Sequence, residues 1–325
     1  MKSRRLLVLF MVAIAVAGVS AQKKVIGVSS QHLGNDFNRG VTAGIADQAK
    51  KLGFQAIMTN AKGDTNQQVA DIENFLSRKV DAVIIAGGEG PAFGPVMKKL
   101  RDAKIPVITV DIPSEYTLCN VTSDNFNGGE QLGLYVANKL KGKGNIIILD
   151  TPGWHSLDIR IRMLKSVIMD YPGIQIVQTI EASVNDAVNS YYQQVKSFLL
   201  ANKNVQAVYC SWGLAAVGAS NAIRELGLQK DIFVVCTDAD QVVLNEMIKP
   251  DSPLTAVVGQ YPNKLGQMSV DMAAAALAGM PIPVEAYAPI ILTEKDNPGA
   301  WFSSPSIMKP ADVWKTLFPG TPLKK

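Results

Sequence analysis

Two aspartates end strand-like apolar runs in different halves of the sequence. Asp111 closes the run from residue 106 to 111, and Asp238 closes the run from 232 to 238. An ionised carboxylate accepts hydrogen bonds through two oxygens, which suits two adjacent hydroxyl groups of a small ligand. Either aspartate alone could equally cap the turn that follows it. Their matching positions in the two halves favour a shared binding site.

Further candidates for such a site lie in the segment from residue 35 to 38, which follows the first apolar run. Asn35 could donate to and accept from a pair of hydroxyl groups, and Phe37 could offer a ring face to the apolar side of a ligand. The alternative is a helix cap followed by a core aromatic residue, which is the commoner fate of these residue types. The sequence leaves both interpretations open.

Four more side chains have suitable chemistry. Trp212 follows the apolar run 205–210 and could stack on a ligand, and Gln260 ends a run where the chain is expected to pass between halves. Arg160 and Arg162 fall in the first turns of a predicted helix, where a guanidinium could fork onto ligand oxygens. Only one of the two arginines is expected to face the site, and the residues themselves do not say which.

No catalytic, metal or cofactor motif accompanies these residues. The sequence contains no GxGxxG loop, no GxxxxGK[ST] loop, no GxSxG elbow and no nucleophile with a neighbouring base. Cys119, Cys210 and Cys236 lie in or beside apolar runs without CxxC spacing, where Cys usually behaves as a small buried hydrophobe. Cys210 and Cys236 could lie on neighbouring strands, but we do not base any prediction on a disulfide, and the sequence leaves the state of the three cysteines open. His32 and His155 are isolated. We therefore expect neither an enzyme nor a metal or cofactor site.

The elements that position these residues alternate between apolar runs and segments with helical periodicity. The expected strands are 25–29, 54–59, 81–86, 106–111, 145–150, 174–180, 205–210 and 232–237. Near-continuous apolar runs are typical of parallel strands that are covered on both faces. Between them lie amphipathic segments such as 64–79, where Asp64 can cap the first turn. This rhythm predicts an α/β protein.

The strand–helix series occurs twice, once up to about Asp124 and again from about Asn145. The strand–helix units of both series together would give more strands than one sheet usually holds. We therefore predict two doubly wound parallel-sheet lobes. Ligands of such sheets bind beyond the carboxyl ends of the strands, which places one shared cleft between the lobes. The two aspartates, one from each half, would then face this cleft.

Residues 1–21 are typical of a signal peptide. A basic start with Lys2, Arg4 and Arg5 precedes the apolar run 6–19, and small residues follow up to residue 21. Its removal takes away three positive charges and lowers the formal net charge from +4 to +1. Apolar residues make up 47% of the chain and its charges are scattered, which argues against a nucleic-acid partner. We expect a soluble protein exported to the periplasm.

The order and spacing of several segments resemble the ribose-binding-like, pentose/hexose group of periplasmic sugar-binding proteins of ABC importers, a type I fold. These segments are 35–37, 105–111, 123–125 with 128–129, 205–208, 234–238 and 259–260. The resemblance implies two lobes joined by a three-segment hinge, a sugar or polyol held between them, delivery to an ABC transporter permease, and a monomer. It implies an N-terminal lobe of residues 22–125 plus 261–289 and a C-terminal lobe of residues 126–260 plus 290–325. By motif match it carries ligand contacts over to Asn35, Phe37, Asp111, Arg162, Asp238 and Gln260.

This sequence departs from the ribose-binding pattern at four positions. Ile112 stands where the group has Arg, Ala86 and Trp212 stand where it has Asn, and Asn38 replaces the second aromatic residue of the first loop. The loss of these donors implies a ligand other than ribose, such as another pentose, a hexose, a deoxy sugar or a polyol.

The same fold could also serve a sugar-responsive repressor or a periplasmic ligand sensor. A sugar-responsive repressor would carry a helix-turn-helix segment before the first strand, which this sequence lacks. The alternative that stays open is a periplasmic ligand sensor for chemotaxis or quorum signalling, with a furanose-like autoinducer as ligand and a chemoreceptor as partner.

Overall fold

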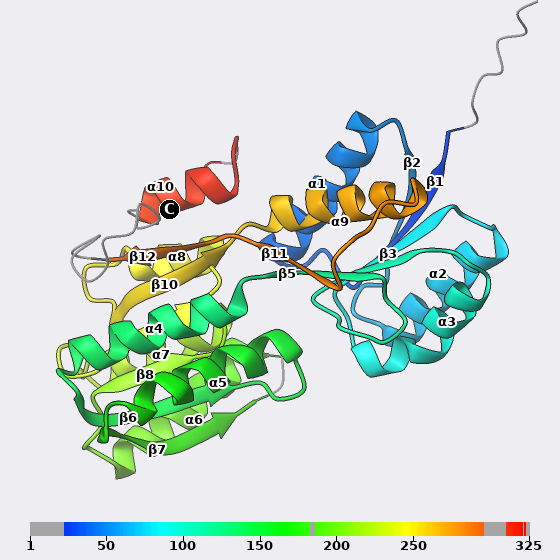
Figure 1. Ribbon diagram of the computed structural model, residues 1–325. Helices are drawn as coiled ribbons and strands as arrows, with labels where there is room; N and C mark the ends of the chain where they lie inside the picture. The colour runs from blue at the N-terminus through cyan, green and yellow to red at the C-terminus, as the bar shows by residue number, and fades with distance from the viewer. Residues whose placement is uncertain (1–22, 183–185, 296–309, 321, 323–325) are drawn as a thin grey trace, which may run out of the picture.

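The computed structural model describes residues 23–182, 186–295, 310–320 and 322, so the predicted signal peptide lies outside the described residues. The chain forms two α/β lobes, each built on a six-stranded sheet (Figure 1). The predicted fold class is confirmed. No helix within the described ranges has the length and apolar character needed to cross a bilayer.

The N-terminal lobe is built on the sheet β11-β5-β4-β3-β1-β2. Its strands are β1 (Val25–Ser30), β2 (Gln55–Asn60), β3 (Ala82–Ala86), β4 (Val107–Val110), β5 (Cys119–Ser123) and β11 (Glu285–Ala288). Its helices are α1 (Asp36–Lys51), α2 (Thr65–Ser77), α3 (Gly90–Asp102) and α9 (Pro262–Leu277). Neighbouring strands in this sheet pair in parallel throughout.

The C-terminal lobe repeats this plan with the sheet β12-β10-β9-β8-β6-β7. Its strands are β6 (Lys143–Asp150), β7 (Gly173–Glu181), β8 (Ala207–Cys210), β9 (Phe233–Thr237), β10 (Leu254–Gln260) and β12 (Ile290–Glu294). Its helices are α4 (Asn125–Lys139), α5 (His155–Met169), α6 (Ala187–Ala201), α7 (Gly213–Glu225), α8 (Gln241–Met247) and α10 (Pro310–Leu317).

Helices cover both faces of each sheet, which explains the continuous apolar character of the strands. In β3, Ile84 belongs to the core beneath α1 and α9, whereas its neighbour Ile85 belongs to the core beneath α2 and α3. Both side chains are fully buried. Successive residues of a strand point to opposite faces, so a strand covered on both sides needs apolar residues at every position.

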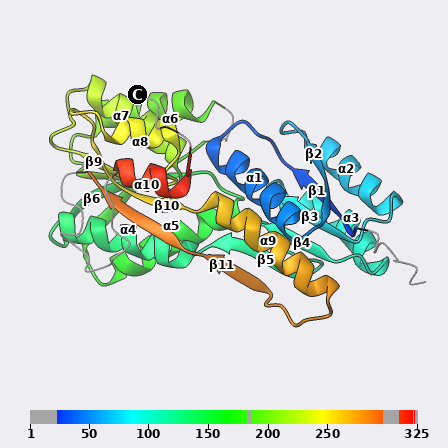
Figure 2. The same cartoon turned by 90° about the horizontal axis from the view of Figure 1, so that it is seen from above.

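Helices α1 and α9 lie side by side although more than 200 residues separate them (Figure 2). Glycines permit the close approach: a Cβ added to Gly44 would lie 2.1 Å from the carbonyl oxygen of Asn263. One added to Gly266 would lie 2.1 Å from the carbonyl oxygen of Val41. This contact fixes α9 to the N-terminal lobe after the chain has left the C-terminal one.

The chain passes between the lobes three times: between β5 and α4, between β10 and α9, and between β11 and β12. The last passage is almost direct, because Pro289 alone separates the two strands (Figure 1). β11 runs parallel to β5, but β12 runs antiparallel to β10, so the second sheet is not wholly parallel. The carboxyl ends of the two sheets face each other. After β11 the chain therefore enters the second sheet at its carboxyl edge, and β12 runs antiparallel to its neighbour β10.

Candidate ligand-binding site

Asp238 lies directly after β9 and is the most heavily contacted carboxylate of the site. Its Oδ1 accepts a hydrogen bond from Nε2 of Gln260 at 2.5 Å and forms an ion pair with Nη1 of Arg160 at 3.4 Å. Its Oδ2 accepts from the backbone nitrogen of Gly213 at 3.4 Å. Three elements that are distant in sequence therefore orient this one side chain. Gln260 is itself buried, at the end of β10.

Arg160 lies inside the C-terminal lobe, with 2% of its surface exposed. Its Nε donates to Oδ1 of Asn125 at 2.8 Å, and its Nη1 donates to the carbonyl oxygen of Ser211 at 2.9 Å. The structure thus brings Arg160 to Asp238. Arg162, the arginine chosen by motif match, is exposed, and its guanidinium lies 5.9 Å from the ring centroid of Phe126.

Asp111 follows β4 in the N-terminal lobe. The hydroxyl of Thr122 donates to its Oδ1 at 2.6 Å. Burial raises the pKa of Asp111, the Thr122 bond and the charge of Arg160 lower it, and the charge of Asp238 raises it. Because Arg160 and Asp238 belong to the other lobe, the two lobes bring their polar groups within electrostatic reach of each other.

Both aspartates have left-handed backbone conformations, with φ of 60° at Asp111 and 79° at Asp238. This region is uncommon for residues other than glycine, although Asp and Asn enter it more readily than most. Backbone strain of this kind concentrates at functional sites, where the surrounding structure holds it in place. The conformation turns each chain sharply at the end of its strand.

In the segment after β1, the sequence left open whether Asn35 and Phe37 contact a ligand or serve as a helix cap and a core residue. The structure gives a different answer for each of the two residues. Asn35 is the N-cap of α1, and its Oδ1 accepts from the backbone nitrogen of Asn38 at 2.8 Å. Phe37 is half-buried against the core of the N-terminal lobe and also lines a small pocket with Asp238 and Gln260. Phe37 is therefore next to the site, and Asn35 has a capping role in this conformation.

Trp212 occupies the N-cap position of α7, half-buried against the core of the C-terminal lobe. Its neighbour Gly213 donates to Asp238, so this turn and the carboxylate share one corner of the site. A Cβ at Gly213 would lie 2.5 Å from Cγ2 of Val243, which accounts for the glycine here.

A hydrogen bond joins the two lobes beside the site. Oδ2 of Asp36, at the start of α1, accepts from the backbone nitrogen of Gln241, at the start of α8, at 2.9 Å. Burial, followed by the charges of Asp238 and Asp36, raises the pKa of nearby Asp240 well above its usual range. Asp36, Asp238 and Asp240 thus make this part of the site rich in carboxyl groups.

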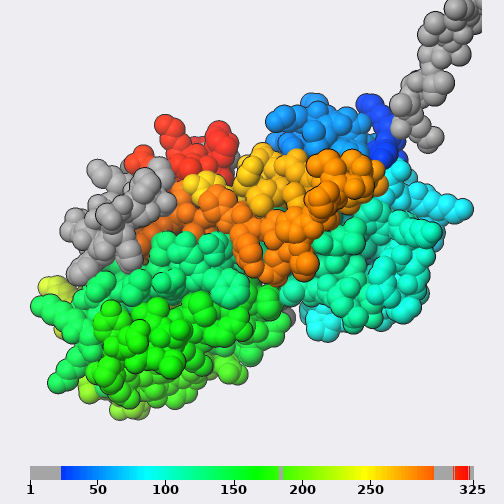
Figure 3. All heavy atoms as spheres, in the orientation of Figure 1, coloured from blue at the N-terminus to red at the C-terminus, as the bar shows by residue number. Residues whose placement is uncertain are grey.

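A larger cleft of 950 Å³ opens between the lobes, and Figure 3 shows the molecular surface hollowed between them. Its lining comes from the end of β7, the first turn of α3 and the segments that follow β3, β6 and β7: Gly88, Glu89, Pro91, Ala92, Thr151, Pro152, Gly153, Trp154, Glu181 and Ala182. Sequence reasoning missed these residues. Their position directly after strands was the available signal, because ligands of parallel sheets bind at that edge.

The three cysteines, a further reactive residue type, lie in the interior of the described part of the chain. The three cysteines are buried and free, and burial raises the pKa of Cys119 to about 11 and those of Cys210 and Cys236 well above their usual range. Thiols of this kind stay protonated and inert. Within the residues that the structure describes, no group of three His, Cys, Asp or Glu side chains could hold a metal ion.

Two parallel-sheet lobes with three passages between them, and a polar site where their strand ends meet, define a two-lobed binding protein. The model of the family described as "Periplasmic binding protein domain" matches residues 26–281, and the chain belongs to this family. The ribose import binding protein of Bacillus subtilis (strain 168) is 28% identical over 279 residues, which cover 84% of this chain and 88% of that protein.

Solved structures agree with this assignment. An ABC sugar transporter subunit from Rhodobacter sphaeroides 2.4.1 has a TM-score of 0.77 and 29% identity, covering 84% of this chain and 99% of that one. An ABC transporter solute binding protein from Agrobacterium vitis with bound allitol has a TM-score of 0.78 and 29% identity, covering 84% and 96%. The resemblance to ribose-binding-like sugar-binding proteins is confirmed. The names of these relatives describe a ribose import binding protein, a sugar transporter subunit and a transporter solute binding protein.

Proposed function

We propose that this chain is a periplasmic solute-binding protein that holds a monosaccharide or polyol other than ribose between its lobes and delivers it to the permease of an ABC importer. The observation that supports this most is the approach of Asp111 and Asp238 from opposite lobes. Each follows directly after a strand of its lobe and has a left-handed backbone conformation.

Binding follows from the chemistry of these groups. Ligand hydroxyls donate to the carboxylate oxygens, and hydrogen bonds to charged acceptors are the stronger kind. Arg160 and Gln260 hold Asp238 in place, so little side-chain entropy is lost when the ligand arrives. A ligand that touches both aspartates bridges the lobes, and its binding energy favours their closed arrangement. The permease can then distinguish loaded from empty protein.

The chemical class of ligand is supported by the relatives. One is named for ribose and another was solved with allitol, an acyclic polyol. Ile112 argues against ribose, because it stands where the ribose-binding pattern has Arg. An isoleucine that is 2% exposed offers the cleft neither a charge nor a hydrogen-bond donor from its side chain. Sites built to satisfy a set of hydroxyl groups discriminate strongly when donors are missing.

The test is a thermal-shift screen of residues 22–325 against pentoses, hexoses and polyols, with the ligand recovered afterwards. A bound ligand stabilises the native state and raises the melting temperature, and we expect it to be recovered chemically unchanged. The proposal fails if no neutral sugar or polyol raises the melting temperature, or if the pure protein converts the bound compound.

A further inference from the structure

The amino edge of the N-terminal sheet carries a concentration of positive charge. Exposed basic side chains stand in the segments that lead into β1, β2, β3 and β4, which are neighbours in this sheet. These seven residues form what we call the basic edge: Lys23, Lys24, Lys50, Lys51, Arg78, Lys79 and Lys104. A hollow in the surface brings four of them together, from the segments before β1 and β3: Lys23, Lys24, Arg78 and Lys79.

Neighbouring carboxylates do not neutralise the basic edge. Within the described residues, none of its seven side chains forms an ion pair. Nζ of Lys24 donates to a backbone carbonyl oxygen at 3.3 Å, which is a neutral acceptor. Asp81 lines the same hollow, and its Oδ2 accepts from the backbone nitrogen of Val25 at 2.7 Å. Glu73 and Asp102 pair with the cations of α3 instead.

Helix dipoles alone do not explain this concentration of charge. Cations are favourable at helix C-termini, and most of the basic edge follows a helix. The C-terminal lobe has the same plan, yet exposed acidic residues are interspersed among the basic ones at its amino edge: Lys141, Asp170, Lys203, Lys230, Asp231, Lys249 and Asp251. Lys249 is also paired there with Glu246. The contrast between two lobes of one design indicates a role that belongs to the N-terminal lobe.

The basic edge lies on the side of its lobe that points away from the C-terminal lobe (Figure 1). The described chain begins at this edge, at Lys23. The apolar run 6–19 of the predicted signal peptide ends four residues before Lys23, and four residues of extended chain span at most about 14 Å. With the apolar run in the bilayer during export, this edge is therefore held at the membrane surface.

We infer that the basic edge is a docking surface for an anionic membrane, where its cations contact acidic lipid headgroups while the cleft stays open to ligand. Each basic side chain close to such a membrane adds to the attraction, and salt screens it. Lysines on flexible stems suit this surface, because lipid headgroups offer charge without a fixed geometry. Docking keeps the protein beside the permease of the proposed importer and raises its effective concentration there. The surface is separate from the ligand site and does not depend on which ligand is bound.

Sedimentation with vesicles tests this docking surface. Residues 1–21 are removed, so that the apolar run cannot bind lipid itself. We expect the protein to sediment with phosphatidylcholine vesicles containing about 30% phosphatidylglycerol in about 20 mM salt, and to be released in about 0.5 M salt. Vesicles of pure phosphatidylcholine should leave it in solution. Sedimentation with both kinds of vesicle, or with neither, overturns the proposal. Retention on an immobilised acidic polypeptide without binding to anionic vesicles also overturns it and assigns the basic edge to a protein partner.

Matched variants then test whether this edge carries the binding. The first variant removes four charges of the basic edge: Lys23→Gln, Lys24→Gln, Arg78→Gln and Lys79→Gln. The control removes four exposed charges at the amino edge of the C-terminal lobe, with the same change in net charge: Lys141→Gln, Lys143→Gln, Lys203→Gln and Lys230→Gln. The first variant should bind anionic vesicles at least about tenfold more weakly than the wild type, and the control should differ by less than about threefold. Equal weakening in both variants would show that net charge alone attracts the protein, and an unchanged first variant would exclude the basic edge; either result overturns the proposal.

Discussion

Arg160 and Asp238 form an ion pair at 3.4 Å, with the guanidinium almost wholly buried and the carboxylate 18% exposed at the edge of the site. The arginine has further bonds to Asn125 and to the carbonyl of Ser211, whereas the aspartate keeps part of its surface open to the cleft. The fixed guanidinium of Arg160 therefore holds the carboxylate of Asp238 in one orientation before a ligand binds.

The ion pair with Asp238 predicts different roles for Arg160 and Arg162. Arg160→Ala should lower the free energy of unfolding by about 3 kcal/mol or more and weaken ligand binding, because it leaves Asp238 without its buried partner. Arg162→Ala should change the free energy of unfolding by less than about 0.5 kcal/mol, as is usual for an exposed side chain. Urea unfolding and calorimetry measure both. Loss of binding in Arg162→Ala with Arg160→Ala unaffected would reverse the assignment.

The two aspartates should act together on the ligand. Replacing either Asp111 or Asp238 with Ala should cost about 1.5–3 kcal/mol of binding free energy, which is typical of hydrogen bonds to charged groups. Asp→Asn at each position separates the loss of charge from the loss of shape. Unchanged calorimetric affinity in both alanine variants would leave these residues with a purely structural role at the strand ends.

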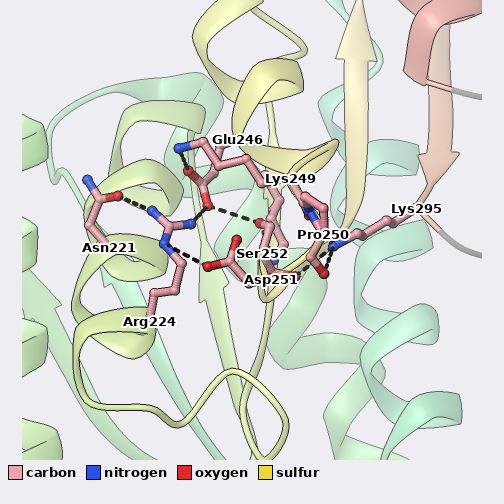
Figure 4. A network of polar contacts seen from close by, with 9 residues as sticks. Asn221, Arg224, Glu246, Lys249, Pro250, Asp251, Ser252 and Lys295 are labelled. Carbon is pink, nitrogen blue, oxygen red and sulfur yellow. Dashed lines mark hydrogen bonds and ion pairs between the residues drawn. The ribbon is translucent and has the colours of Figure 1, made fainter.

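A polar network on the C-terminal lobe ties the turn after α8 to its surroundings (Figure 4). The nearly buried Glu246 forms ion pairs with Arg224 and with Lys249, the latter at 2.7 Å, and accepts a hydrogen bond from Ser252 at 3.0 Å. Lys295 donates to backbone carbonyls of the same turn. This turn precedes β10, so it lies at the amino edge of the sheet, opposite the ligand site.

The network should therefore matter for stability and not for binding. Glu246→Ala should cost about 3 kcal/mol of unfolding free energy, because it leaves Arg224 partly buried with one carboxylate fewer. Lys249→Ala should cost less than about 1 kcal/mol, since Lys249 is half-exposed. Denaturant titration checks both values. A tenfold or larger change in ligand affinity in either variant would contradict the conclusion that this network, at the amino edge of the sheet, does not affect the ligand site at the opposite edge.

Glu294, at the end of β12, predicts a pH dependence of stability. It is 2% exposed, and burial raises its pKa to about 7, although the charge of Lys139 lowers it. A raised pKa means that the folded state prefers the neutral acid. This stabilisation is therefore complete below about pH 4.5, the ordinary pKa of Glu, and is lost progressively as the pH rises to about 7.

The melting temperature of the wild type should thus fall between about pH 4.5 and about pH 7 and level off above pH 7, and Glu294→Gln should flatten this fall. The exposed Glu130→Gln serves as the control and should follow the wild-type profile. Parallel profiles of wild type and Glu294→Gln would show that Glu294 does not titrate in this range.

The strands that the sequence predicted well are those covered on both faces, because every residue in them must be apolar. β5 escaped prediction because Asn120, Thr122 and Ser123 make it polar. Asn120 accepts a hydrogen bond from the backbone nitrogen of Ile112, and Thr122 donates one to Asp111. β10, β11 and β12 were also not among the expected strands. The antiparallel direction of β12 depends on how the lobes face each other and not on local pattern.

For the site, strand ends were enough to predict the positions of Asp111 and Asp238. Two positions along a helix correspond to a rotation of about 200°, so Arg160 and Arg162 must point to different sides. Which side is buried depends on how α5 packs on the sheet, and the sequence alone could not settle it. Trp154 was missed for a related reason, because its loop approaches the cleft only when both lobes are assembled.

The central claim is that one small neutral ligand bridges the lobes and draws them together. Small-angle X-ray scattering of the mature protein, with and without a saturating ligand from the thermal-shift screen, tests it most directly. Short linking segments permit hinge motion while each sheet stays rigid. We expect the radius of gyration to fall and the pair-distance profile to shorten on binding. An unchanged radius of gyration and an unchanged pair-distance profile at saturation would contradict ligand-driven closure.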